Sequence, residues 1–190
     1  MKLADVVYNL ATGPDRRRRF LAPIWAATFF ALMVAVVAGG MLTDRVLGLP
    51  RLLDGVAGVG IGVALMSAGM VVYAWCVALF LKAKGTPVPV SPPREVVQGG
   101  PYAVVRNPML TGLFTSLFGL GFILHSASTV FVWIPLFILL NAIELRLVEE
   151  PELERRLGVK YVAYRRRVPR FLPRLRDRSD SGRRPTSGRS

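Results

Sequence analysis

Residues 107–143 read NPMLTGLFTSLFGLGFILHSASTVFVWIPLFILLNAI and contain no aspartate, glutamate, lysine or arginine. The run is 37 residues long, whereas one membrane-spanning helix needs only about 20. A polar tetrapeptide, HSAS at residues 125–128, lies near its middle. The stretch therefore predicts a hairpin of two spanning helices, over about 105–124 and 129–148, joined by a tight turn.

Two further stretches without charged side chains lie earlier in the chain, over residues 20–43 and 55–81. Each is long enough for one spanning helix, so we expect spans over about 20–42 and 55–81. The chain has 190 residues, of which 52% are hydrophobic, and a mean hydropathy of +0.42, which is too apolar for an ordinary soluble domain. The sequence predicts an all-α, polytopic membrane protein with four transmembrane helices.

The 25 lysine and arginine residues are distributed unevenly around these spans. Five lie in residues 1–19, four in 82–106 and fourteen from residue 144 onward, whereas the 125–128 turn has none. Because positively charged segments tend to stay cytoplasmic, we expect both termini and the 82–106 loop on that side. Arginine greatly outnumbers lysine, which is typical of a GC-rich bacterial genome and suggests the bacterial inner membrane.

The net charge of +13 could also indicate a nucleic-acid partner. Arginines beside spans set topology and contact anionic headgroups, so we expect the lipid bilayer as the partner and no nucleic acid. Three segments are expected from this pattern: an interfacial lead-in over 1–19, a membrane domain over 20–174, and a disordered basic tail over 175–190. Oligomeric state stays open, because small residues at Gly58/Gly62 and Gly60/Ala64/Ala68 suit internal packing or a homodimer.

Two polar motifs flank the predicted hairpin. The first, GPYAVVRNPMLTG, covers residues 100–112. The second begins with EEPEL at 149–153 and continues through Gly158 and two tyrosines to VPRFLP at 168–173. A helix is expected over about 149–167, with acidic residues at the positive end of its dipole. Because a hairpin brings both motifs to the same membrane face, the layout predicts an enzyme site there and more than a simple anchor.

This paired pattern resembles the isoprenylcysteine carboxyl methyltransferase family and its relatives among the phospholipid methyltransferases. The resemblance covers roughly residues 82–174, with the motif spacing kept throughout. The chain departs from the family at Asn107, where many members have histidine, at Leu110, where tyrosine is common, and at Leu157, where phenylalanine precedes the glycine. The resemblance implies S-adenosylmethionine as the cofactor and a cytoplasmic C-terminal helix that completes the cofactor site.

The resemblance also implies roles for particular residues. Arg106 and Glu150 are the expected catalytic residues. The expected cofactor-binding residues are Tyr102, Asn107, Pro108, Gly112, Glu149, Tyr161, Tyr164, Pro169 and Arg170. Gly112, one turn into its helix, would leave room for the cofactor to approach the backbone. Two alternatives stay open: Arg106 as an interfacial anchor, and the two glutamates as partners of Arg146 or Arg155.

The function indicated by the resemblance is methyl transfer to a lipophilic or small acceptor that carries a thiol, a carboxylate or an amine. One alternative is an enzyme that resembles the NADPH-dependent sterol reductases. Another is a non-catalytic membrane protein that keeps the fold. No metal site is expected, because the single cysteine, Cys76, cannot by itself form a cysteine-based metal site, and the single histidine, His125, lies at the turn away from both motifs.

Overall fold

The computed structural model describes residues 15–82 and 98–171, and the regular secondary structure within these ranges is entirely helical, without strands. The predicted lead-in lies mostly outside the described residues, and the predicted tail lies wholly outside them, as does much of the 82–106 loop. The main helices are α2 (Asp15–Leu47), α3 (Val56–Lys82), α4 (Pro108–Ile123), α5 (Ile134–Glu144), α6 (Glu150–Leu157) and α7 (Val159–Arg167). A 3-10 turn, η1 (Gly100–Ala103), and two π-helical turns, η2 (Thr129–Trp133) and η3 (Leu145–Glu149), complete the described elements.

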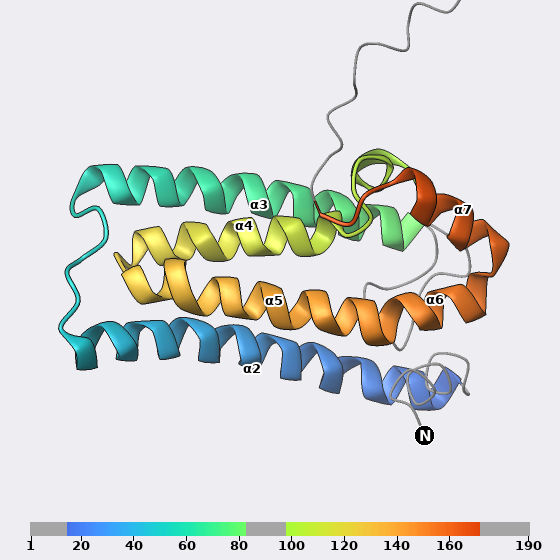
Figure 1. Ribbon diagram of the computed structural model, residues 1–190, viewed down its shortest axis with the longest axis horizontal. Helices are drawn as coiled ribbons and strands as arrows, with labels where there is room; N and C mark the ends of the chain where they lie inside the picture. Colours follow the sequence, from blue (N-terminus) through green and yellow to red (C-terminus); the bar gives the residue numbers. More distant parts are fainter. Residues whose placement is uncertain (1–14, 83–97, 172–190) are drawn as a thin grey trace, which may run out of the picture.

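Helices α2 to α5 run side by side along the length of the molecule (Figure 1). The α2–α3 connection and the turn between α4 and α5 lie at one end (Figure 1). Helices α6 and α7 lie at the other end, close to the start of α4 (Figure 1). The fold therefore gathers both polar motifs at one end of an apolar helical bundle.

Three helices are long and apolar enough to cross a membrane: Pro23–Leu47, Val56–Lys82 and Thr129–Leu157. The helix expected over 105–124 is shorter, because α4 begins only at Pro108 and has 16 residues. Proline favours the first position of a helix, and the preceding Asn107 has a non-helical backbone (φ −124°, ψ 57°). The length criterion thus supports three of the four predicted spans.

The last span differs from its prediction. No break occurs near residue 148, since α5 continues through η3 directly into α6. Pro151 lacks a backbone N–H and its ring clashes with the preceding turn of a regular helix, so the wider π-helical turn just before it relieves that clash. The predicted single helix over 149–167 is instead interrupted at Gly158, whose positive φ of 57° separates α6 from α7.

Helices α3 and α4 approach each other through glycines. A Cβ atom added at Gly62 would lie 2.6 Å from the carbonyl oxygen of Gly119, and one added at Gly112 would lie 2.7 Å from that of Gly69. By contrast, the Gly60 position has no other atom within 4 Å. The Gly58/Gly62 spacing therefore serves packing inside the chain, which is one of the two alternatives that the sequence left open.

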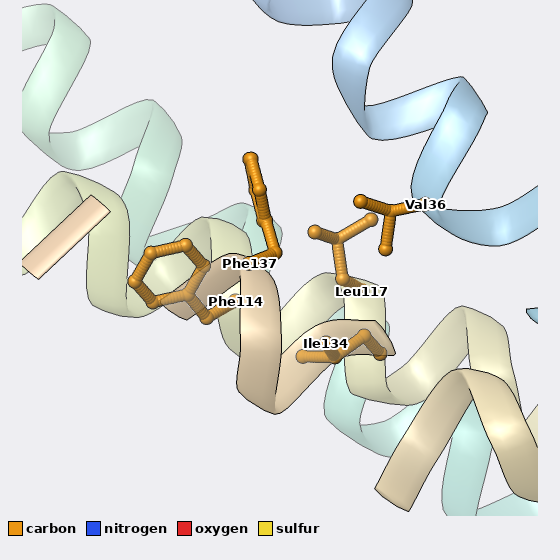
Figure 2. Close-up of a cluster of buried hydrophobic side chains, with 5 residues drawn as sticks. All are labelled: Val36, Phe114, Leu117, Ile134 and Phe137. Atoms are coloured by element: carbon orange, nitrogen blue, oxygen red, sulfur yellow. The ribbon is translucent and has the colours of Figure 1, made fainter. Parts of the chain in front are cut away.

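The core joins α2, α4 and α5. Figure 2 shows its buried side chains, which are Val36 from α2, Phe114 and Leu117 from α4, and Ile134 and Phe137 from α5. The rings of Phe114 and Phe137 meet edge to face, with their centroids 5.9 Å apart. At the far end, the Asp44 carboxylate of α2 accepts hydrogen bonds from the Ser126 hydroxyl and from the Ser128 backbone N–H (2.8 Å). These contacts fix α4 and α5 in register with α2.

Candidate active site

A buried ion-pair cluster joins the two sequence motifs. The Glu150 carboxylate at the start of α6 lies between two arginines. Its Oε1 is 2.9 Å from Nη1 of Arg106. From the other side, Arg170 donates from Nε to Oε1 (3.0 Å) and from Nη2 to Oε2 (2.8 Å). A buried carboxylate is costly unless it is paired, so this two-sided pairing offsets the cost of burying Glu150.

The segment after α7 folds back against the start of α4. Arg106 N–H donates to the carbonyl oxygen of Pro169 (2.7 Å), and Asn107 N–H donates to that of Arg170 (3.1 Å). Phe171 then packs beside Phe114, with ring centroids 6.4 Å apart. Backbone groups just before a helix need such partners when water is excluded. Two hydrogen bonds and one aromatic contact therefore hold Arg170 in reach of Glu150.

Three buried tyrosines surround the cluster. The hydroxyl of Tyr164 donates to the backbone carbonyl of Tyr102 (2.7 Å), which ties α7 to η1. The Tyr161 and Tyr164 rings, one turn apart on α7, have centroids separated by 6.3 Å. Burial raises the pKa of Tyr161 to about 12, and the nearby Glu150 charge adds to this effect. Burial also raises the pKa of Tyr164 to about 12 and that of Tyr102 above its usual range, so all three phenols are protonated at neutral pH.

Arg106 retains hydrogen-bonding capacity after these contacts. Its side chain is only 12% exposed. Within the described residues, no acceptor meets its Nε or Nη1 in hydrogen-bonding geometry, although Nη1 is close enough to Glu150 for an ion pair. Buried donors without an acceptor are rare in folded proteins. These two donors are themselves covered by the protein, so an oxygen or nitrogen atom of a ligand would reach them when a neighbouring side chain moves aside.

Most of the residues that the sequence indicated lie around this cluster. They are Tyr102, Arg106, Asn107, Pro108, Glu150, Tyr161, Tyr164, Pro169 and Arg170. Glu149, at the end of η3, is half-buried and precedes the paired carboxylate by one residue. The two glutamates are thus not equivalent, and Glu150 pairs across the fold with Arg106 and Arg170, where the sequence alternative was Arg146 or Arg155.

Gly112 differs from its predicted role. The side on which a side chain would project faces α3, where the Gly69 carbonyl oxygen, the Tyr73 backbone nitrogen and Val72 lie within 3.2 Å of the added Cβ atom. On this side of Gly112, the space expected for a cofactor is occupied by α3. The absence of a side chain at Gly112 permits close helix packing.

The sequence analysis missed Glu152, which is buried and pairs with Arg156 at 2.8 Å within α6. The signal was present in the four-residue spacing of these opposite charges on a helix. This pair stabilises α6, the helix that carries Glu150. It is a structural neighbour of the cluster and has no contact with Arg106 among the described interactions.

Comparison with known proteins identifies the family. A family model described as phospholipid methyltransferase matches residues 57–160, which are more than half of the chain. The chain belongs to the phospholipid methyltransferase family. The matched range includes Arg106 and Glu150. The third member of the cluster, Arg170, lies outside that range but forms an ion pair with Glu150.

One curated relative is the nickel-cobalt-cadmium resistance protein NccN of Alcaligenes xylosoxydans xylosoxydans. It is 28% identical to this chain over 153 residues, which are 80% of this chain and 64% of the relative. The chain therefore spans less than two thirds of the length of that relative. No solved structure matches the chain.

Proposed function

We propose that this phospholipid methyltransferase family member is an integral membrane enzyme that transfers a methyl group from S-adenosylmethionine to a lipophilic or small acceptor with a thiol, carboxylate or amine. The observation that supports it most directly is the Arg106–Glu150–Arg170 cluster with its spare Arg106 donors. The proposed enzyme domain covers residues 20–174, and the alternative of a plain interfacial anchor for Arg106 does not account for buried donors.

The chemical character of the cluster fits S-adenosylmethionine. The Arg106 donors suit its carboxylate, and the glutamates suit its amino or ribose groups. Tyr161 and Tyr164 supply protonated hydroxyls and aromatic faces beside Arg106. When bound, this cofactor supplies a methyl group that the positive sulfur already activates. The task left to the chain is to hold the acceptor in line and to exclude water.

The fold divides the proposed reactants by polarity. The ion-pair cluster lies at one end of the bundle, whereas α2, α3 and α5 expose large apolar side chains along their length. A polar cofactor would therefore reach the cluster from the water phase, and a lipophilic acceptor would reach it laterally from the bilayer. We propose that the protein lies in the bacterial inner membrane with its arginine-rich end on the cytoplasmic side, because positively charged segments tend to stay cytoplasmic.

The orientation predicts the accessibility of the opposite end. Cysteines introduced at Asp54 and at His125 should react with a membrane-impermeant thiol reagent from outside spheroplasts, because both positions flank the turns opposite the cluster. The native Cys76 is buried and should not interfere. Reaction of either engineered cysteine only after the cells are opened would reverse the proposed topology.

Cofactor binding is the decisive test of function. Purified protein in nanodiscs should bind S-adenosylmethionine in calorimetry, and Arg106→Leu should reduce the affinity by at least about tenfold through loss of a charge-assisted hydrogen bond. Binding of NADPH without S-adenosylmethionine would favour the reductase alternative. Binding of neither would favour a non-catalytic protein that keeps the fold.

A further inference from the structure

The inward face of α5 has one polar residue that the cluster does not use. Ile134, Phe137, Asn141 and Leu145 succeed one another at spacings of three and four, which places them on one face of the helix. Ile134, Phe137 and Leu145 are 0–2% exposed, yet Asn141, between them, is only half-buried. Asn141 therefore stays partly accessible in the middle of an otherwise buried face.

The amide nitrogen of Asn141 has a hydrogen-bond partner, whereas the amide oxygen has none among the described residues. Its Nδ2 donates to the carbonyl oxygen of Phe137 (2.7 Å), which fixes the orientation of the amide, because that carbonyl can only accept. No donor reaches its Oδ1 among the described residues, and this oxygen is not among the sealed polar atoms. By contrast, Thr111 and Thr115 on α4 donate their hydroxyls to carbonyl oxygens of the preceding turn.

Asn141 lies at the same depth as Leu110 of α4. The two helices are antiparallel, and Phe114 meets Phe137 across them. Leu110 and Asn141 are each four residues from that contact toward the cluster, a distance of about 6 Å along each helix. Leu110 packs against the core and has no hydrogen-bonding group. The free amide oxygen thus lies about one turn deeper than Arg106, at the level of an apolar side chain of α4.

A free amide oxygen in the apolar interior of a membrane protein is costly and marks a functional position. From residues 108 to 143, Asn141 is the only amide or charged residue in the sequence. We propose that Asn141 and Leu110 line the acceptor side of the site, where the Asn141 oxygen accepts a hydrogen bond from an N–H or O–H group on a lipophilic molecule. That the bound molecule is a methyl acceptor rests on the proposed function, but binding at Asn141 can be tested without the cofactor.

The test compares two amphiphiles that share a dodecyl chain and a positive head group, of which only one has N–H donors. Leu110→Cys is labelled with a small neutral thiol reagent in nanodiscs, in the presence of dodecylamine or of dodecyltrimethylammonium, which lacks an N–H. Half-protection should need about tenfold less dodecylamine, since a hydrogen bond from a charged donor contributes about that factor. In the Leu110→Cys/Asn141→Leu variant, the two amphiphiles should protect equally. Asn141→Gln, which keeps the amide, should retain part of the preference.

Two controls make each result decisive. Leu145 lies on the same face of α5 as Asn141 and is 2% exposed, so a cysteine at this position should react much more slowly than the cysteine of Leu110→Cys. The unmodified chain, whose single Cys76 is fully buried, should not label. Equal labelling of Leu110→Cys and Leu145→Cys, or equal protection by both amphiphiles when Asn141 is present, would overturn the inference. Because S-adenosylmethionine is absent, such a failure is separate from failure of cofactor binding.

Discussion

Replacement of Glu150 by glutamine is expected to lower methyl transfer by at least about 100-fold, because the substitution removes the charge that holds two half-buried arginines in place. Glutamine can keep part of the geometry, but it leaves Arg106 and Arg170 uncompensated in a region with little water. Removal of one partner from a buried ion pair is strongly destabilising for the same reason. The measurements are transfer of a labelled methyl group, cofactor affinity by calorimetry, and thermal stability in detergent.

Glu154 supplies a matched control in the same helix. Its carboxylate pairs with Arg165, and both side chains are about one third exposed. Pairs that water can reach contribute little to stability, so Glu154→Gln should keep cofactor affinity and thermal stability near those of the unmodified protein. Wild-type turnover in Glu150→Gln would show that the cluster only anchors helices.

The two arginines should respond differently to substitution. Arg106 has spare donors toward a ligand, whereas Arg170 directs its Nε and Nη2 to Glu150. Arg170 is thus a positioning residue in this proposal, and Arg170→Lys should retain part of the cofactor affinity through its remaining charge. Arg106→Lys should retain less, because lysine cannot reproduce the planar set of donors.

The composition of the cluster could be predicted from the sequence, but its pairing could not. The two motifs flank a charge-free hairpin, so Arg106 and the glutamates had to lie at the same end. Which glutamate meets Arg106 depends on the π-helical turn at Leu145–Glu149, because one added residue rotates the rest of the helix by about 100°. A hydropathy pattern contains no signal for that turn beyond the proline just after it.

The contacts of the segment after α7 could not be predicted from the sequence either. The return of Pro169 and Arg170 to α4 depends on the sharp turn at Gly158 and on two backbone hydrogen bonds, which residue spacing does not specify. The sequence analysis did not single out Asn141, which the sequence marks only as a lone amide in an apolar run. Its significance comes from the burial of Phe137 and Leu145 on either side of it.

Gly112, a residue of the first sequence motif, lies in the close contact between α4 and α3. Gly112→Val is expected to lower thermal stability to a similar extent as Gly62→Val, because a Cβ atom at either position would collide with a backbone carbonyl oxygen of the facing helix, at 2.7 and 2.6 Å respectively. A backbone atom cannot move aside as a flexible side chain can, so helices α3 and α4 must separate. Overpacking of this kind costs about 1–3 kcal/mol, and sometimes more.

Gly60→Val is the matched control, since Gly60 lies two residues from Gly62 on α3 and has open space around it. It should keep the thermal stability of the unmodified protein in detergent. The comparison also separates two roles for Gly112, because Gly62 packs beside Gly119 in the opposite half of α4 from the start of that helix, where Arg106 lies. If Gly112→Val lost cofactor affinity while its thermal stability stayed unchanged, the glycine would serve the cofactor, and its assignment to helix packing would be wrong.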